Sequence, residues 1–182
     1  MPPGCARPSE SRPRRCADLA RVSRHDRPVS ETLVEYVVNW RAGAGSNGAD
    51  ALRFSLGLFE DAVSQFECDI PGVDSASTEV AQAAATLRGV ARWPNRQPPA
   101  TGVLKAGNSL VWDAFVAFAP YALDGSLWVH GDGRPVVSFA DQGTSVVVRL
   151  DADQAQRLSA SIAPAQLVPV KDWHRRPEED RA

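Results

Sequence analysis

The sequence predicts an α+β fold: an antiparallel β-meander of about four to six strands, with two to three helices packed mainly on one face. Turn sequences are the first observation behind this prediction. Asp124-Gly125, His130-Gly131-Asp132-Gly133 and Asp141-Gln142-Gly143 interrupt an apolar region at intervals typical of hairpin-connected strands. The second observation lies upstream, where apolar residues recur at helical spacing. The third is Asp151 with Gln154, a variant capping box that predicts a helix after the meander.

One strand and two helices are predicted before the meander. Residues 33–40 alternate between two faces, which indicates a half-buried strand that places Trp40 in the core. A long core helix is expected next, because five apolar residues repeat at four-three-four-three spacing: Leu52, Leu56, Phe59, Val63 and Phe66. A second helix is predicted for residues 74–89, with Asp74, Ser75 and Ser77 as candidate N-caps and Gly89 as a candidate C-cap.

The sheet is expected to come mainly from residues 108–150. Leu110 to Phe118 is the most apolar strand candidate, and its Trp112 and Phe118 are expected in the core. Shorter strands are predicted at residues 126–130, 135–140 and 144–150. Helix 151–162 follows, Pro164 ends it, and residues 166–170 are expected to form a last edge strand.

Charge divides the chain into three parts. Residues 1–28 carry a net charge of +4, are rich in Arg and Pro and lack apolar periodicity, so we expect a disordered tail or a mis-assigned start. Residues 29–170 carry −6 and form the predicted single α+β domain, and residues 171–182 form a charged C-terminal tail. An acidic body disfavours nucleic acid as the main partner and is compatible with a basic protein partner.

Several classes of protein are disfavoured by what the sequence lacks. No apolar segment approaches the roughly 18 residues of a membrane span and no secretion signal is visible, so a cytoplasmic protein without a membrane partner is expected. The three cysteines offer neither a disulfide framework nor a metal-ligand pair, and Cys68 is expected to be a small core residue. No catalytic set or cofactor motif occurs, so we expect no cofactor and no metal and lean against an enzyme. The residue bias is typical of a GC-rich bacterial gene.

Asp113 is the first candidate site residue, because it lies among apolar neighbours on both faces of the predicted strand. A buried carboxylate needs a partner, and burial raises its pKa in the way that acid–base chemistry requires. The alternative is that its side of the sheet faces solvent, or that it pairs with an arginine such as Arg149.

Trp128, His130 and Asp132 are the other candidate binding residues. A histidine beside a carboxylate is the smallest acid–base pair, and Trp128 shares a strand face with His130, where the two could line a shallow pocket. A hairpin turn also needs the Gly131, Asp132 and Gly133 sequence for its geometry alone. No catalytic residue is assigned.

Three functions remain open. The first is a small acidic binding module, such as an immunity-type or regulatory protein that covers a partner. The second is a small-molecule binder or enzyme with a pocket between sheet and helices that uses Asp113 or His130. The third is a nucleic-acid binder that uses the Arg-rich residues 1–28. The sequence leaves the oligomeric state unknown.

Overall fold

The computed structural model describes residues 33–39, 48–72, 77–162 and 166–173. All of them belong to one compact unit, Thr32–Ala182, and the separate unit Met1–Glu31 lies outside the described residues. The predictions for the N-terminal tail, Trp40, Asp74, Ser75, Pro164 and residues 174–182 therefore concern parts of the chain that are not described.

The described residues form an α+β fold around one seven-stranded, fully antiparallel sheet, so the predicted fold class is confirmed with more strands than expected. The strands are β1 Val34–Asn39, β2 Val63–Cys68, β3 Leu104–Lys105, β4 Asp124–Val129, β5 Val137–Ala140, β6 Ser145–Leu150 and β7 Gln166–Pro169. The helices are α1 Gly48–Gly57, α2 Thr78–Val90, α3 Ser109–Phe118, α4 Ala152–Ile162 and the single turn α5 Val170–Trp173. The sheet order is β3-β2-β4-β5-β6-β1-β7, with the predicted meander β4-β5-β6 at its centre.

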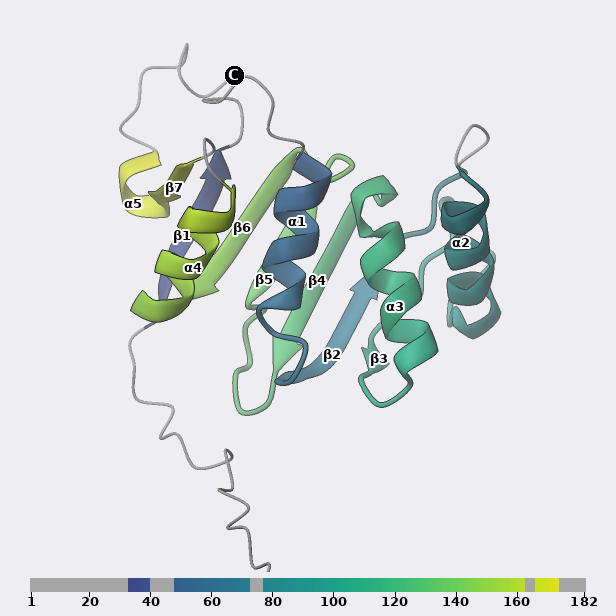
Figure 1. Cartoon of the computed structure of the whole chain (residues 1–182). Helices are drawn as coiled ribbons and strands as arrows, with labels where there is room; N and C mark the ends of the chain where they lie inside the picture. Colours follow the sequence, from purple (N-terminus) through teal and green to yellow (C-terminus); the bar gives the residue numbers. More distant parts are fainter. Residues whose placement is uncertain (1–32, 40–47, 73–76, 163–165, 174–182) are drawn as a thin grey trace, which may run out of the picture. The chain divides into compact units, whose positions relative to one another are not determined.

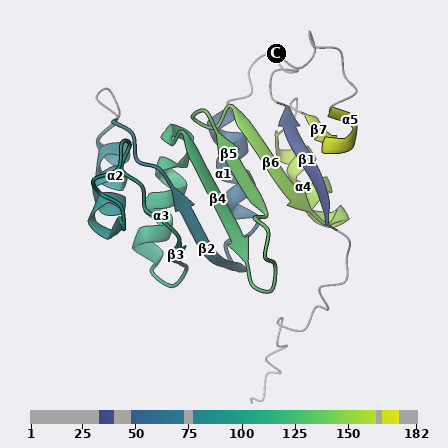
Figure 2. The ribbon, with the colours of Figure 1, turned by 180° about the vertical axis from the view of Figure 1, so that it is seen from behind.

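The larger helices lie on one side of the sheet. Figure 1 shows α4, α1 and α3 in front of the strands, with α2 beyond α3, and Figure 2 shows the strands from the opposite side. The core fills the space between sheet and helices. Its aromatic centre joins Phe66 of β2 to Trp112 and Phe115 of α3, and Phe115 to Phe139 of β5, with ring centroids 4.6–6.1 Å apart. Trp112 and Phe118 are buried, as predicted.

The prediction of a strand at residues 110–118 is wrong, because this segment is helix α3. Its N-cap is Asn108, whose side-chain oxygen accepts hydrogen bonds from the backbone N–H groups of Leu110 and Val111. Almost every residue of this segment is apolar, so the strand period of two and the helix period of 3.6 both fit it. The N-cap residue is what distinguishes the helix from the strand.

The predicted long helix through Phe66 is also wrong in its second half. Helix α1 ends at Gly57, a turn follows in which the Phe59 N–H bonds to the Leu56 carbonyl, and Val63–Cys68 is strand β2. Phe66 would face the core in the predicted helix and does so in strand β2. Its burial therefore does not distinguish a helix from a strand. The alternation of buried Phe66 and Cys68 with less buried Gln65 and Glu67 is the pattern of a strand.

Two predicted helix starts are confirmed. The Val80 N–H donates to the Ser77 hydroxyl at the start of α2. At the start of α4 the Gln154 N–H donates to the Asp151 carboxylate, and the Asp151 N–H donates to the Gln154 side chain, which is a reciprocal capping box. Gly89 is not the C-cap of α2, because that helix continues to Val90 and its cap is Ala91. No described helix has the length and apolar content needed to cross a membrane.

Candidate functional site

The side of the sheet opposite α1, α3 and α4 is covered by no described α-helix of two or more turns (Figure 2). The strand pairs Glu67–Ser126, Ser126–Ser138, Ser138–Val147 and Val147–Val37 place these side chains in one row across this side. The next row contains Lys105, Gln65 and Trp128. We call this side of the sheet the open face.

The row through Ser126, Ser138, Val147 and Val37 carries no charged residue, whereas Arg149 and Glu35, two residues away from Val147 and Val37, bring charge to the same side of the sheet. Ser126, Ser138, Val147 and Val37 are all half-buried, and the charged residues Glu67 and Lys105 lie toward one edge. An antiparallel sheet that faces water normally alternates apolar residues inward with polar residues outward. A half-buried row without charge instead matches the depletion of charge at the core of protein–protein interfaces.

One end of the β2–β4 ladder forms a concavity of about 480 Å³, which we call the His130 hollow. Trp128 and His130 lie along one wall, Lys105 and Gln65 along another, and the turn at Asp132 closes it. A register shift in β2 at Ser64 opens the ladder here, and the Ser64 hydroxyl donates to the Trp128 carbonyl. Bulges of this kind re-aim side chains beside functional sites.

Asp132 has a structural partner in this hollow. Its carboxylate accepts hydrogen bonds from the Arg149 guanidinium at 2.9 Å and from the Arg134 N–H at 3.0 Å. These two donors, the Arg134 N–H first, hold the pKa of Asp132 below its usual value. Arg134 in turn contacts Glu35 of β1. The charges of Asp132 and Arg149 are therefore paired with each other, while Lys105 forms no ion pair within the described residues.

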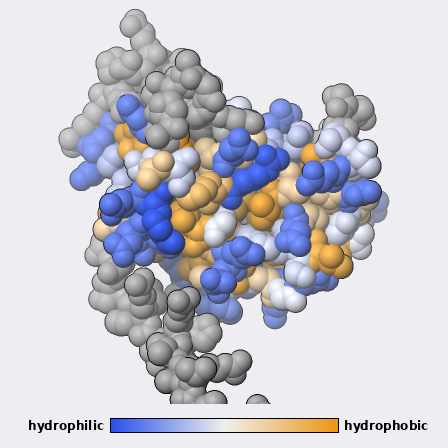
Figure 3. All heavy atoms as spheres, in the orientation of Figure 1, coloured by the Kyte–Doolittle hydropathy of each residue, from blue (hydrophilic) through white to orange (hydrophobic). Residues whose placement is uncertain are grey.

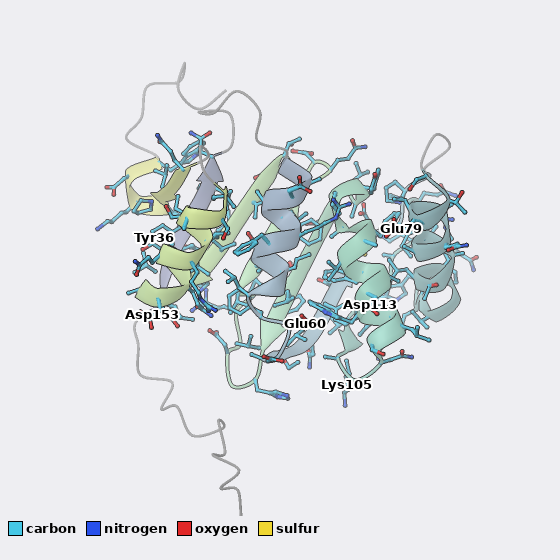
Figure 4. All side chains as sticks on the ribbon, in the orientation of Figure 1. Tyr36, Glu60, Glu79, Lys105, Asp113 and Asp153 are labelled. Carbon is cyan, nitrogen blue, oxygen red and sulfur yellow. The ribbon has the colours of Figure 1, made fainter. Side chains whose placement is uncertain are left out.

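Three of the four predicted site residues meet in the His130 hollow, and Asp113 does not. Asp113 is exposed on the outer side of α3 and contributes to neither concavity of the open face (Figure 4). Of the two alternatives for Asp113, solvent exposure applies, and Arg149 binds Asp132 instead. His130 is exposed and Trp128 is half-buried at the hollow. Asp113 is therefore not the buried carboxylate that the strand pattern suggested.

The other end of the β2–β4 ladder forms a smaller concavity of about 290 Å³, which we call the Glu67 notch. Three carboxylates line it: Glu67, Asp69 and Asp124. Trp93, with 52% of its surface exposed, and Arg96 form the opposite wall. The Asp69 carboxylate accepts hydrogen bonds from the N–H groups of Leu123 and Asp124 at 2.7 and 3.1 Å.

Residues 92–101 form a small two-stranded turn that carries Trp93 and Arg96. Trp93 and Ala100 exchange two backbone hydrogen bonds, and Thr101 anchors the turn to β2. The fully buried Thr101 hydroxyl accepts from the Cys68 N–H and donates to the Cys68 carbonyl. The wall of the notch is thus fixed to the sheet by a satisfied buried hydroxyl.

Crowding of like charges disturbs the notch electrostatically. Burial, and then the neighbouring Asp124, raise the pKa of Glu67, while Arg96 lowers it. Burial also raises the pKa of Asp69 against the opposing effect of its backbone hydrogen bonds. A cation placed here would relieve these costs. The thiol of Cys68 faces the core, and burial raises its pKa, which makes it a poor nucleophile.

Sequence reasoning missed the notch because residues 63–66 were assigned to a helix. In a strand, Glu67 and Asp69 share a face and lie about 7 Å apart, but on a helix they point in different directions. The alternation of residues 65–68 was the available signal. Trp93 and Lys105 give no local signal, since only the sheet order brings them to the open face.

No group of three or more His, Cys, Asp or Glu side chains suited to a metal ion occurs among the described residues. No protein-family model, curated protein or solved structure matches this chain. The geometry of the open face is therefore what bears on function.

Proposed function

We propose that this chain is a small acidic protein-binding module, of the immunity or regulatory type, that covers a partner with the open face of its sheet. The observation that carries this proposal is the uncharged, half-buried row from Ser126 to Val37 on that face, flanked by charged residues and by Trp128. Protein interfaces are depleted of charge and enriched in aromatic residues at their centre, and Trp128 lies in the row next to the uncharged one.

The helix side offers a weaker alternative surface. Hydrophilic residues there surround separate apolar patches (Figure 3), and a concavity beside α1 is lined by charged residues together with Phe54. Phe54 is exposed, but its neighbours Asp50 and Arg53 form an ion pair across the same surface. Phe54 therefore supplies a matched control site for tests of the open face.

Affinity capture from the organism that encodes the chain tests the proposal. Val147→Lys places a charge at the centre of the open face, and Phe54→Lys places the same charge on the helix side. We expect the wild type and Phe54→Lys to retain a stoichiometric partner that Val147→Lys loses, since a buried unpaired charge is costly. Recovery of no stoichiometric partner by the wild type contradicts the function, and retention by Val147→Lys contradicts the surface.

The His130 hollow supports a second candidate, a small-molecule binder. Its volume lies within the range of ligand sites, and its lining combines an aromatic ring with several polar groups. If this function is correct, a metabolite retained by the native protein should be lost from Trp128→Ala and kept by Asp113→Ala. Equal retention by both variants contradicts it.

A further inference from the structure

The two concavities of the open face differ in charge. The Glu67 notch contains three carboxylates against one guanidinium, that of Arg96. The His130 hollow contains Lys105 and His130 together with Asp132, whose charge is paired with that of Arg149. Both concavities lie on the same pair of strands, at opposite ends. Asp124 and Trp128 are four residues apart on β4, which corresponds to about 14 Å.

We propose that the open face binds a second copy of this chain, and that each copy places its Glu67 notch against the His130 hollow of the other. This inference rests on the proposal that the open face is a protein-docking surface, and it names the partner. A twofold interface must be self-complementary, because the same surface serves on both copies. The charges of the open face meet that requirement.

The required symmetry axis lies in the interface, runs across the strands and passes between the Glu67–Ser126 row and the Gln65–Trp128 row. A twofold rotation about this axis reverses the direction of every strand in the second copy. β2 of one copy then lies opposite β2 of the other, and β4 lies opposite β4. Lys105 then faces the carboxylates of the notch, and those carboxylates face Lys105 in return. An axis parallel to the strands would bring each notch opposite β1 and β6, where Glu35 already pairs with Arg134.

The surface between the two concavities is shaped for close approach. Ser126, Ser138 and Ala140 are small, and Val147 and Val37 extend their row without charge, while Arg149 and Glu35 lie in the neighbouring row. Two sheets can pack face to face at about 10 Å when small and apolar side chains fill the space between them.

The size of the face sets the expected affinity. The five strands from β2 to β1 span about 20 by 17 Å at ordinary strand spacing, which is small beside the roughly 800 Å² per partner of a standard interface. We therefore expect a weak, reversible dimer.

Sedimentation of charge-reversed variants of the full chain tests the inference. We expect Glu67→Lys and Lys105→Glu each to weaken self-association at least about tenfold, because each places like charges opposite one another twice in the dimer. An equimolar mixture of the two variants should dimerise nearly as well as the wild type, since both contacts then pair opposite charges. Loss of folding cannot produce this recovery.

Two further variants control the measurement. Asp124→Lys makes the same charge reversal at an exposed position of the notch, and should act like Glu67→Lys if the latter fails to fold. Lys171→Glu reverses the other lysine of the chain, away from both concavities, and should leave the dimer unchanged.

A wild type that stays monomeric up to several hundred micromolar overturns the inference. So does a mixture of the two variants that remains monomeric while each variant is folded. If the wild type is monomeric but Val147→Lys still loses a captured partner of different mass, the protein-binding function stands and only the identity of the partner is wrong. If there is neither a dimer nor a captured partner, both proposals fail.

Discussion

At the scale of single residues, Thr101 shows how one buried hydroxyl fixes a surface segment. Its hydroxyl makes the two hydrogen bonds that a neighbouring strand would otherwise make with Cys68, one with the N–H and one with the carbonyl. The Thr101 N–H also donates to the Cys68 carbonyl, so that carbonyl has a second donor, whereas the Cys68 N–H depends on the hydroxyl. Removing the hydroxyl would leave one buried N–H without its acceptor.

We expect Thr101→Val to lower the free energy of unfolding by about 1–3 kcal/mol, the cost of leaving a buried polar group unsatisfied. Urea denaturation measures this change. Thr144→Val, at an exposed turn position, should stay within about 0.5 kcal/mol of the wild type. Equal effects of the two substitutions would show that the Thr101 hydroxyl does not hold the turn.

Glu67 and Asp132 should give pH dependences of opposite sign. The pKa of Glu67 is raised in the folded state, so ionisation of this residue at pH values above its usual 4.5 opposes folding. We expect Glu67→Gln to raise the free energy of unfolding at pH 7.5 relative to the wild type. The difference should shrink as the pH falls toward 4, where the wild-type carboxyl is protonated.

The pKa of Asp132 is lowered, so its ionised form favours folding at pH values above its usual 3.8, and this contribution is lost as the pH falls below it. We expect Asp132→Asn to lower the free energy of unfolding at pH 7.5 and to approach the wild type toward pH 3. Denaturant titrations across this range measure both variants. If both substitutions changed the free energy of unfolding at pH 7.5 in the same direction, the pKa shifts assigned to Glu67 and Asp132 would be contradicted.

At the scale of elements, α3 shows where the sequence is ambiguous. The segment holds nine apolar or small residues around Asp113, so a strand pattern and a helix pattern both fit it. Only Asn108, outside the apolar run, favours the helix by capping it. The same ambiguity affected residues 57–66. By contrast, turn chemistry located β4, β5 and β6: Asp141, Gln142 and Gly143 all adopt positive φ angles, which Gly143 and Asp141 tolerate well.

The helical assignment of α3 makes a sharp prediction for two neighbouring positions. Phe115 is fully buried against Phe66, Trp112 and Phe139, so Phe115→Ala should cost about 3–5 kcal/mol of unfolding free energy. Asp113→Ala should change it by less than about 0.5 kcal/mol because that side chain is exposed. Thermal or urea unfolding compares them, and a large loss from Asp113→Ala would restore a buried role for that carboxylate.

At the scale of the whole molecule, the fold class followed from the sequence but the sheet order did not. Periodicity and turns reveal local elements, whereas the pairing of β2 with β4, or of β1 with both β6 and β7, joins segments far apart in the chain. Trp128, His130 and Asp132 are close in sequence and could be grouped from it. The Glu67 notch combines residues from β2, β4 and the turn at Trp93, so it emerges only from the assembled sheet.

Amide hydrogen exchange should reproduce the sheet order. The backbone N–H groups of β4, β5 and β6, which have neighbours on both sides, should exchange most slowly, near the rate of global unfolding. Those of the two-residue β3 and of β7, at the sheet borders, should exchange fastest among the strands. Slow exchange at β3 in dilute protein would contradict its position at the border.

The place of β1 between β6 and β7 has a consequence for the order of synthesis. Val37 pairs with Val147 on one side and with Val168 on the other, so the first strand of the fold has neither neighbour until almost all of the domain has been translated. The β4-β5-β6 hairpins can form as they emerge, because their partners are adjacent in the chain. During synthesis, β1 therefore leaves the ribosome well before either of its native partner strands.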